Sequence, residues 1–260
     1  MILPPPNQLG APQRFDRWRA GQDDALIQAW GAPTRAIVLD LPVGLGKSVV
    51  NVTYNTAHQR AFTYTTVSRG LQDQVQREFS SIGLVDVRGM QNYECLELPG
   101  KKWNTCERGP CLDGMDCSYR NRGCLYYDQV RLWTSQQRRL TNYAWWINRA
   151  RKGDSIGHLD TLVMDEGHDA AEMVASAMRL TFSQDEAMLP SPWPLMLPEW
   201  QRWADKALVG AKRDLSMATA GTQEHRELKD LVVCLETLIT AAGEWVWEYD
   251  ETRREAILEP

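Results

Sequence analysis

The chain places five of its six cysteines within thirty residues, at Cys95, Cys106, Cys111, Cys117 and Cys124. A short segment of this kind buries too little apolar surface to order itself, and bound metal compensates for a small core. The amino terminus has neither the basic start nor the apolar stretch of a secretory signal, and no run of eighteen apolar residues follows. We therefore expect a cytoplasmic protein without a membrane segment. Because thiols stay reduced there, the cluster predicts metal ligands rather than disulfides.

On either side of the cysteines, short apolar runs alternate with helical patterns. Strands are predicted at residues 36–41, 61–67 and 159–164, with helical spacing at residues 71–79 and a helix that opens at Ser48. Strands that alternate with helices predict an α/β fold with a largely parallel sheet, whose ligands bind at the carboxyl ends of the strands.

A glycine-rich loop, Pro42-Val-Gly-Leu-Gly-Lys-Ser48, joins the first predicted strand to the first predicted helix. Without side chains at Gly44 and Gly46, backbone N–H groups can turn inward around phosphate oxygens. Lys47 can then neutralise the outer phosphates while the Ser48 hydroxyl reaches Mg²⁺. The loop departs from the standard phosphate loop, because Leu41 stands where the first glycine is usual. Its place between a strand and a helix favours nucleotide binding over an incidental turn.

An acidic box, Asp165-Glu-Gly-His168, follows the third predicted strand, 118 residues after Lys47. At that position Asp165 can hold Mg²⁺ through water, Glu166 can polarise an attacking water, and His168 can link the nucleotide to another ligand. The alternative is a capped helix start, because acidic residues favour helix amino termini. The buried strand in front of the box favours the catalytic interpretation.

Charge is divided unevenly along the 260 residues, whose net charge is −5. Residues 1–87 carry 8 basic and 7 acidic side chains, residues 88–153 carry 12 and 6, and residues 154–260 carry 9 and 21. The basic middle, around the cysteines, can meet phosphates although the whole chain is acidic. Charge alone leaves a solvated basic face equally open.

Seven segments follow one another in a recognisable order: Arg19-Ala-Gly-Gln22, Asp40 to Ser48, Tyr64 to Gln74, Asn92-Tyr-Glu-Cys95, Cys124-Leu-Tyr-Tyr127, Thr141-Asn-Tyr-Ala144 and Asp165-Glu-Gly-His168. Within residues 14–172, they resemble the motifs of the iron–sulfur DNA helicases of superfamily 2, the XPD/DinG group. That family tolerates a residue other than glycine at the position of Leu41. The last segment is similar to its DEAH box, with glycine in the third place.

The resemblance implies a RecA-like helicase domain at residues 1–89 and 125–172, an inserted iron–sulfur domain at residues 90–124, and the beginning of a helical arch domain at residues 173–260. It implies ATP hydrolysis with Mg²⁺, coupled to 5′ to 3′ translocation on single-stranded DNA. Partners from DNA repair or replication are expected. The second helicase domain has no counterpart in this sequence, so we expect an incomplete enzyme that binds single-stranded DNA and hydrolyses ATP poorly by itself.

The resemblance also assigns roles to particular residues. Gln22 would read adenine, and Pro42, Gly44, Gly46, Lys47 and Ser48 would hold phosphates and Mg²⁺ together with Asp165. Glu166 and His168 would complete the catalytic set. Contacts with single-stranded DNA are expected from motif Ia and from basic residues near the cysteines, namely Thr66, Ser68, Arg69, Lys101, Lys102, Arg120 and Arg122.

Four thiolates hold the family's [4Fe–4S] cluster, and this sequence has five candidate cysteines. The flanks that resemble the family's select Cys95 and Cys124, and the similarity of the spacing to the family's pattern favours Cys111 and Cys117 as the middle pair. A rival set replaces Cys111 with Cys106. Zinc is the chemical alternative, because four thiolates also make a closed zinc site. The resemblance favours the iron–sulfur cluster, and the lack of a Cys-x-x-Cys pair weakens the case for zinc.

Two other classes of function stay open. One is a loading module that binds ATP and single-stranded DNA without hydrolysis. The other is a metal-dependent nuclease, which would need more clustered acids than Asp165 and Glu166 provide. The acidic residues 173–260 have a mostly helical pattern, and four prolines, Pro190, Pro192, Pro194 and Pro198, predict a connection between two of these helices.

Overall fold

The computed structural model describes residues 2–100, 104–113, 115–151, 153–184, 189–220 and 222–260. The chain divides into two compact units. The first unit comprises Met1–Gly89 and Leu125–Ala170, and the second comprises Met90–Cys124 and Ala171–Pro260. Among the described helices, none has both the length and the apolar composition that crossing a membrane requires.

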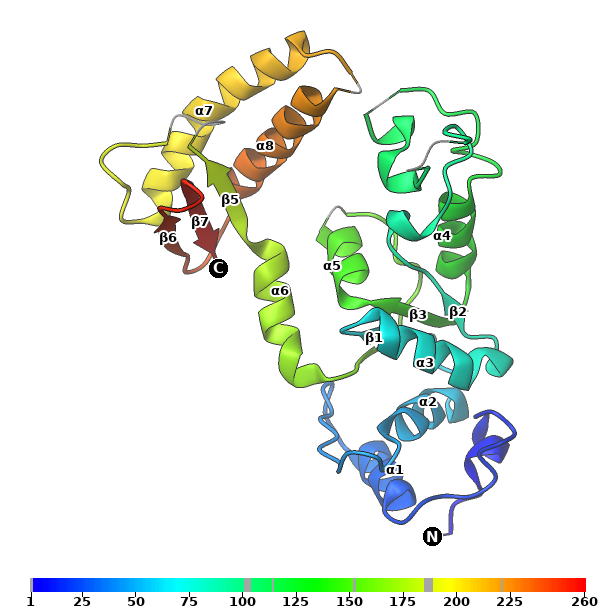
Figure 1. The fold of residues 1–260 in the computed structure, drawn as a ribbon. Coiled ribbons are helices and arrows are strands. Elements are labelled where there is room, and N and C mark those ends of the chain that lie inside the picture. Colours follow the sequence, from blue (N-terminus) through cyan, green and yellow to red (C-terminus); the bar gives the residue numbers. More distant parts are fainter. Residues whose placement is uncertain (1, 101–103, 114, 152, 185–188, 221) are drawn as a thin grey trace. The chain divides into compact units, whose positions relative to one another are not determined.

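A parallel sheet of four strands forms the centre of the first unit (Figure 1). Its order is β2 (Val85–Asp86), β3 (Arg138–Asn142), β1 (Phe62–Thr66) and β4 (Thr161–Met164). Every residue of β1 is buried, because this strand pairs with β3 on one side and β4 on the other. Its aromatic and β-branched residues suit a position enclosed on both faces. The α/β class and the parallel sheet are therefore confirmed.

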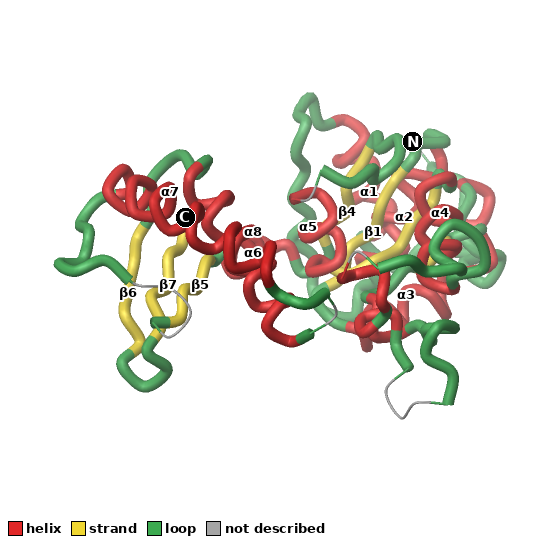
Figure 2. The backbone as a smooth tube through the Cα atoms, turned by 90° about the horizontal axis from the view of Figure 1, so that it is seen from above, coloured by secondary structure: helices red, strands yellow, loops and turns green. Residues whose placement is uncertain are grey.

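Five helices accompany this sheet, which Figure 2 shows as yellow strands among red helices. They are α1 (Gln22–Gly31), α2 (Lys47–Ala57), α3 (Arg69–Phe79), α4 (Leu125–Ser135) and α5 (Tyr143–Arg151). The core joins α2 and α3 to the sheet through buried residues that include Val52, Phe62, Val75, Phe79 and Leu140. The predicted helices at residues 71–79 and from Ser48 onward are confirmed, as are the strands within residues 61–67 and 159–164.

The strand predicted at residues 36–41 is absent, although the structure describes this segment throughout. Leu39 and Leu41 are partly buried and pack on the small core of α1 and α2, whereas Val38 is 90% exposed. The alternating apolar side chains of this segment therefore pack against α1 and α2. No ladder of backbone hydrogen bonds is needed for that packing.

The described carboxyl-terminal part of the second unit combines three helices with a three-stranded antiparallel sheet. After α6 (Ala170–Met178) come β5 (Leu180–Ser183), α7 (Leu197–Met217), α8 (Gln223–Ile239), β6 (Val246–Asp250) and β7 (Glu255–Glu259). Trp200, Leu235 and Leu258 lie in its core. The mostly helical prediction for residues 173–260 thus missed three strands. The prolines connect β5 with α7, not two helices, and Pro198 lies in the first turn of α7, where the missing N–H costs nothing.

The cysteine segment belongs to the same unit and has little regular structure. It contains 3₁₀ turns at Cys106–Arg108 and Pro110–Asp113, and an isolated antiparallel bridge between Glu94 and Thr105. Lys229 of α8 donates a hydrogen bond of 2.6 Å to the Leu112 carbonyl oxygen. A side chain of the helical part therefore supports this segment.

Candidate nucleotide and metal sites

The glycine-rich loop leads directly into the amino terminus of α2. Gly46 precedes the helix with φ of 89°, and Gly44 has φ of 83°, values at which a side chain would strain the backbone. The first turn of α2 contains no acidic residue. Its N–H groups and the positive end of the helix dipole can therefore attract an anion.

Gln22, the first residue of α1, and Arg19, which precedes that helix, hold this loop. The Gln22 amide nitrogen donates to the carbonyl oxygens of Leu45 at 2.7 Å and Gly46 at 3.3 Å, while its oxygen accepts from the Arg19 N–H at 2.9 Å. Arg19 in turn donates to the Gly44 carbonyl oxygen at 2.8 Å. A Cβ at Gly46 would lie only 2.7 Å from the Gln22 amide nitrogen. In the described conformation, buried Gln22 thus shapes the loop, and its amide is occupied by protein partners.

Lys47 and Ser48, the first two residues of α2, are half-buried beside the acidic box. The Lys47 ammonium donates to the Leu41 carbonyl oxygen at 3.4 Å. It is also close enough to Asp165 for its charge to lower the pKa of that carboxyl group. The structure therefore brings the two sequence motifs together at one end of the sheet.

The buried Tyr64 makes the connection between these motifs. Its hydroxyl donates a hydrogen bond of 3.2 Å to Ser48 Oγ, and the Asp165 carboxyl group lies close enough for the two side chains to change one another's pKa. Burial raises the pKa of Tyr64 far above its usual value, and the nearby Asp165 charge raises it further. The phenol therefore stays protonated at any physiological pH and serves as a fixed hydrogen-bonding group.

Asp165 follows β4, and its N–H donates to the Thr65 carbonyl oxygen at 3.0 Å, which extends the pairing with β1. Burial raises the pKa of Asp165, and the Glu166 charge adds to this effect. The nearby Tyr64 hydroxyl and the Lys47 charge act in the opposite direction. A bound divalent cation would offset the unfavourable free energy of keeping a partly buried carboxylate ionised. Asp165 is therefore a suitable metal ligand.

Glu166 has a left-handed backbone with φ of 51°, which is unusual for a residue other than glycine. Its side chain does not cap the 3₁₀ turn that follows. The Glu166 carboxylate lies 3.6 Å from His168 Nδ1, and Asp169 lies 3.3 Å from His168 Nε2. The side chains of the box therefore interact with one another, which is not what a simple helix cap would give.

Three of the clustered cysteines are buried: Cys95 is 6% exposed, Cys106 is 5% exposed and Cys124 is 7% exposed. The Glu94–Thr105 bridge sets Cys95 and Cys106 diagonally on one face, because each follows a bridge residue on its own strand. The sulfur atoms of Cys106 and Cys124 lie 4.0 Å apart. These three thiols therefore face a common interior.

Cys111 joins this group at Gly109. A Cβ at Gly109 would lie 3.2 Å from Cys95 Sγ and 3.7 Å from Cys111 Sγ, so the two thiols flank the same glycine. Cys117 is only half-buried, unlike Cys95, Cys106 and Cys124. Among the described residues, no three His, Cys, Asp or Glu side chains are arranged to hold a single metal ion. Four thiolates are the donors that an iron–sulfur cluster takes, and the gathered four fit that chemistry.

The residues expected to bind DNA have different environments. Thr66 is fully buried, and its hydroxyl donates to the Ser68 carbonyl oxygen at 3.2 Å, so it offers no surface to a strand of DNA. The Ser68 hydroxyl caps α3 by accepting from the Leu71 N–H at 3.3 Å, while Arg69 beside it is exposed. Exposed side chains in the cysteine segment include Arg120 and Arg122. Lys101 and Lys102 lie outside the described residues.

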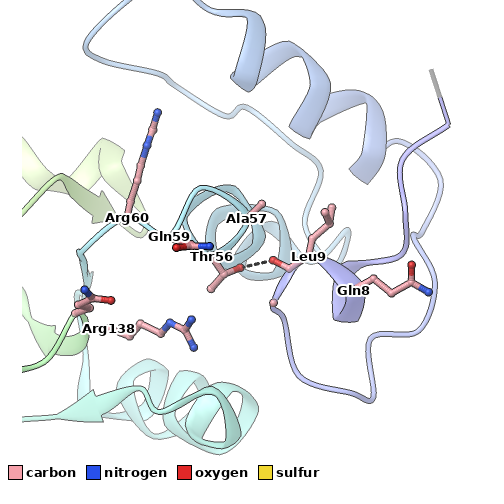
Figure 3. A pocket seen from close by; sticks show the side chains of 9 residues that line it. Gln8, Leu9, Thr56, Ala57, Gln59, Arg60 and Arg138 are labelled. Atoms are coloured by element: carbon pink, nitrogen blue, oxygen red, sulfur yellow. Dashed lines mark hydrogen bonds between the residues drawn. The ribbon is translucent and has the colours of Figure 1, made fainter.

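A separate polar cavity of about 440 Å³ lies at the amino ends of β1 and β3 (Figure 3). Arg60 and Arg138 line it, together with Thr56, whose hydroxyl donates to the Leu9 carbonyl oxygen at 2.9 Å. None of the residues predicted for the nucleotide or metal sites contributes to this cavity.

Sequence reasoning missed two tyrosines at the candidate nucleotide site, Tyr64 and Tyr143. Both are fully buried; the Tyr143 hydroxyl donates to the Asp165 carbonyl oxygen, and Tyr64 lies close enough to the Asp165 carboxyl group to change its pKa. The sequence feature that could have identified them is a side chain with a hydroxyl group within, or directly after, an apolar strand.

Neither a protein-family model nor a curated protein sequence matches this chain.

Proposed function

We propose that this chain is the first ATP-binding domain of an ATP-dependent DNA helicase, with a RecA-like fold and an inserted iron–sulfur module. One observation carries the proposal: Tyr64 donates a hydrogen bond to Ser48 of the glycine-rich loop and, like Lys47, lies close enough to Asp165 of the acidic box to change the pKa of its carboxyl group. Motifs 118 residues apart thereby form one site at the carboxyl ends of parallel strands, where ligands of such sheets bind. The protein acts in the cytoplasm on single-stranded DNA, which it follows in the 5′ to 3′ direction.

In this function, the N–H groups at the start of α2 and the Lys47 ammonium bind the phosphates of ATP. Ser48 and Asp165 would hold Mg²⁺, which neutralises charge on the phosphate oxygens. Glu166 accepts a hydrogen bond from the attacking water and orients it, and His168 beside it holds the carboxylate in place. Gln22 keeps the loop in shape by binding two of its carbonyl groups.

The iron–sulfur cluster would be held by Cys95, Cys106, Cys111 and Cys124. This set replaces Cys117, which the sequence favoured, with Cys106. The choice is supported by the burial of Cys106, by its 4.0 Å distance from Cys124, and by the approach of Cys95 and Cys111 to Gly109. The thiolates would order a segment that has little regular structure of its own.

The test uses a fluorescent ATP analogue and three proteins: the wild type, Lys47→Ala and Glu166→Gln. The wild type should bind the analogue more tightly with Mg²⁺ than with EDTA. Lys47→Ala should weaken binding by about tenfold to a hundredfold, because an ammonium–phosphate contact contributes about 1.5–3 kcal/mol. Wild-type affinity in Lys47→Ala would refute the proposed site.

Glu166→Gln separates a helicase from a loading module that only binds ATP. The chain is expected to hydrolyse ATP only slowly by itself, so hydrolysis with single-stranded DNA is followed over a long incubation with excess protein. The variant should keep the wild-type affinity for the analogue and lose this slow hydrolysis. Measurable hydrolysis at the same rate in the variant and the wild type would exclude Glu166 as the residue that orients water.

A further inference from the structure

The polar cavity at the amino ends of β1 and β3 has no part in the proposed function (Figure 3). Its walls come from the amino-terminal segment around Gly10, from the end of α2 with the residues that follow it, and from the start of β3. Two arginines and three glutamines line it, and no acidic side chain is among the described residues that do so. The lining of this space of about 440 Å³ is therefore polar and carries positive charge.

Close contacts hold the walls of the cavity in place. The buried Thr56 hydroxyl donates to the Leu9 carbonyl oxygen at 2.9 Å, which ties the amino-terminal segment to α2. Gly10 has φ of 94°, and a Cβ there would lie 2.9 Å from Thr56 Cβ, so the two segments approach closely. Just before β3, the Gln137 carbonyl oxygen accepts from the Phe62 N–H at 2.7 Å. The cavity is therefore preformed, as ligand sites usually are.

Arg138, the first residue of β3, is the cation that can serve a ligand. One of its Nη1 protons is donated to the Ile82 carbonyl oxygen at 2.6 Å, and within the described chain no acidic side chain pairs with it. A guanidinium has five N–H donors, so most of them remain. Arg60 differs, because its Nη1 donates to the Tyr54 hydroxyl at 2.8 Å and its guanidinium lies over the Tyr54 ring. Figure 3 shows Arg138 extending beneath the end of α2 and Arg60 directed away from it.

Gln59, in the same lining, has an unusual backbone. Its φ of 54° is left-handed, a conformation for which glycine is the common residue after a helix. Its N–H donates to the Thr56 carbonyl oxygen at 3.1 Å, and the Arg60 N–H donates to the Asn55 carbonyl oxygen at 3.0 Å. Because these carbonyl groups are satisfied, the end of α2 repels an anion less than a bare helix terminus would. A glutamine thus occupies a position where glycine would be less strained, which is typical of functional sites.

We propose that this cavity is a second ligand site, separate from the nucleotide site, for a small polar molecule that carries a phosphate or carboxylate group. Arg138 binds the oxyanion, since a guanidinium presents paired donors that match its oxygens. The Gln59 amide adds a donor to the oxyanion, and the exposed Gln137 amide is available to the rest of the molecule. The volume falls within the range of about 300–1,000 Å³ that small-molecule sites occupy. This inference does not depend on the proposed function.

The test is a titration of the full chain, followed through its backbone amide signals by nuclear magnetic resonance. Inorganic phosphate and acetate are added in separate experiments. The amides of Gly10 and Ala57 report on the cavity, while those of Gly46 and Ser48 report on the glycine-rich loop. Each salt that binds the cavity should shift the first pair of signals with a dissociation constant on the order of millimolar, as expected for a few polar contacts. Tighter binding of phosphate would identify a phosphate ester as the ligand, and tighter binding of acetate would identify a carboxylate.

Two variants remove the groups that bind the oxyanion. Arg138→Gln should weaken binding at the cavity by about tenfold or more, because a charged hydrogen bond is lost. Gln59→Gly should weaken it by about threefold to tenfold while its unfolding temperature stays the same or rises, since glycine relieves the left-handed backbone. If Arg138→Gln does not fold, Gln59→Gly decides the question.

Arg254→Gly is the matched control. Arg254 is exposed, has a similar φ of 55° and lies in the second unit, so this variant removes a positive charge and a left-handed side chain far along the chain from the cavity. Its binding of both salts should equal that of the wild type. An equal loss in Arg254→Gly would assign the binding to net charge and overturn the proposal.

Two further results would also overturn it. One is the absence of shifts at Gly10 and Ala57 with both salts well above millimolar concentration. The other is wild-type binding by both Arg138→Gln and Gln59→Gly. Shifts confined to Gly46 and Ser48 would place the anion in the glycine-rich loop alone, which would support the proposed function and refute the second site.

Discussion

The Tyr143 hydroxyl donates a hydrogen bond of 2.9 Å to the backbone carbonyl oxygen of Asp165. Tyr143 begins α5 directly after β3, whereas Asp165 follows β4, and β1 lies between those two strands. The hydrogen bond therefore reaches across the end of the central strand. It holds the main chain of the acidic box from a second strand, while Tyr64 of β1 lies near the carboxyl group of the same aspartate.

Cys106 and Cys117 provide a matched pair of variants to test the proposed iron–sulfur cluster. Cys106→Ser should lose most of the iron and sulfide bound per chain, because its thiol lies inside the gathered group, while Cys117→Ser should retain wild-type amounts. The measurements are iron and sulfide analysis and visible absorption after anaerobic purification. The reverse result would restore the set with Cys117, and a colourless wild type with stoichiometric zinc would exclude the iron–sulfur cluster.

Arg120 and Arg122 lie exposed in the basic cysteine segment and are expected to follow a DNA backbone. Replacing both with alanine should weaken binding to a thymine oligonucleotide and flatten the salt dependence. Each lost phosphate contact should reduce the slope of log affinity against log salt by about 0.7. Fluorescence anisotropy between low and moderate salt measures this slope.

Arg213→Ala is the control for this experiment, because Arg213 is an exposed residue of α7 that pairs with Asp214. An equal change of slope in the control would show that the effect comes from the net charge of the protein and not from phosphate contacts of Arg120 and Arg122.

Asp160 connects the start of β1 to the chain before β4, because its carboxylate accepts from the Ala61 N–H at 2.8 Å. This hydrogen bond lowers the pKa of Asp160 below its ordinary value of 3.8, and the neighbouring His158 lowers it further. A lowered pKa means that the stabilisation is complete above the unfolded value and is lost as the pH falls through the folded value. Asp160→Ala should therefore unfold at a lower temperature than the wild type at neutral pH, with the difference closing in acid.

Thermal unfolding from pH 7 to pH 3 tests this prediction. A difference that stays constant over the whole range would assign the effect to packing and not to the ionised carboxylate.

Gly157 occupies a position that excludes any side chain. Its φ is 71°, and a Cβ would collide with the Thr134 carbonyl oxygen and the Arg139 guanidinium group. Gly153 has a similar φ of 68° but no neighbouring atom within 4 Å of the corresponding Cβ. Gly157→Ala should therefore lower the free energy of unfolding by about 1–3 kcal/mol more than Gly153→Ala does. Denaturant unfolding measures both, and equal losses would show that the loop adapts to the added methyl group.

The local sequence pattern was sufficient to predict β1, β4, α2 and α3, because the apolar residues of each element recur with the spacing of its buried face. It was insufficient for β3, where Arg138 and Arg139 give the strand a surface-like composition. Arg139 is nevertheless fully buried, with its guanidinium group 5.0 Å from the centre of the Trp133 ring. Burial also lowers the pKa of Arg139. The partners that make this position tolerable come from α4 and from the carbonyl groups of Ile156 and His158, which no short window of sequence reveals.

The candidate site shows the same division. Motif order predicted Lys47, Ser48 and Asp165 as members of one site, and the structure places them together. The contribution of Tyr64 depends on its register between β3 and β4, which the sequence did not specify. The gathering of Cys106 depends on the bridge between Glu94 and Thr105, which spacing alone could not show.

The position of the cysteine segment between β2 and β3 bears on how the sheet forms. These two strands pair in parallel, so folding must close the chain from residue 86 to residue 139 before their hydrogen bonds can form. The entropy cost of closing such a loop grows with its free length. A cluster that links Cys95 to Cys124 would remove most of that free length. Binding of the proposed iron–sulfur cluster would therefore also speed the pairing of β2 with β3, although neither strand contains a cluster ligand.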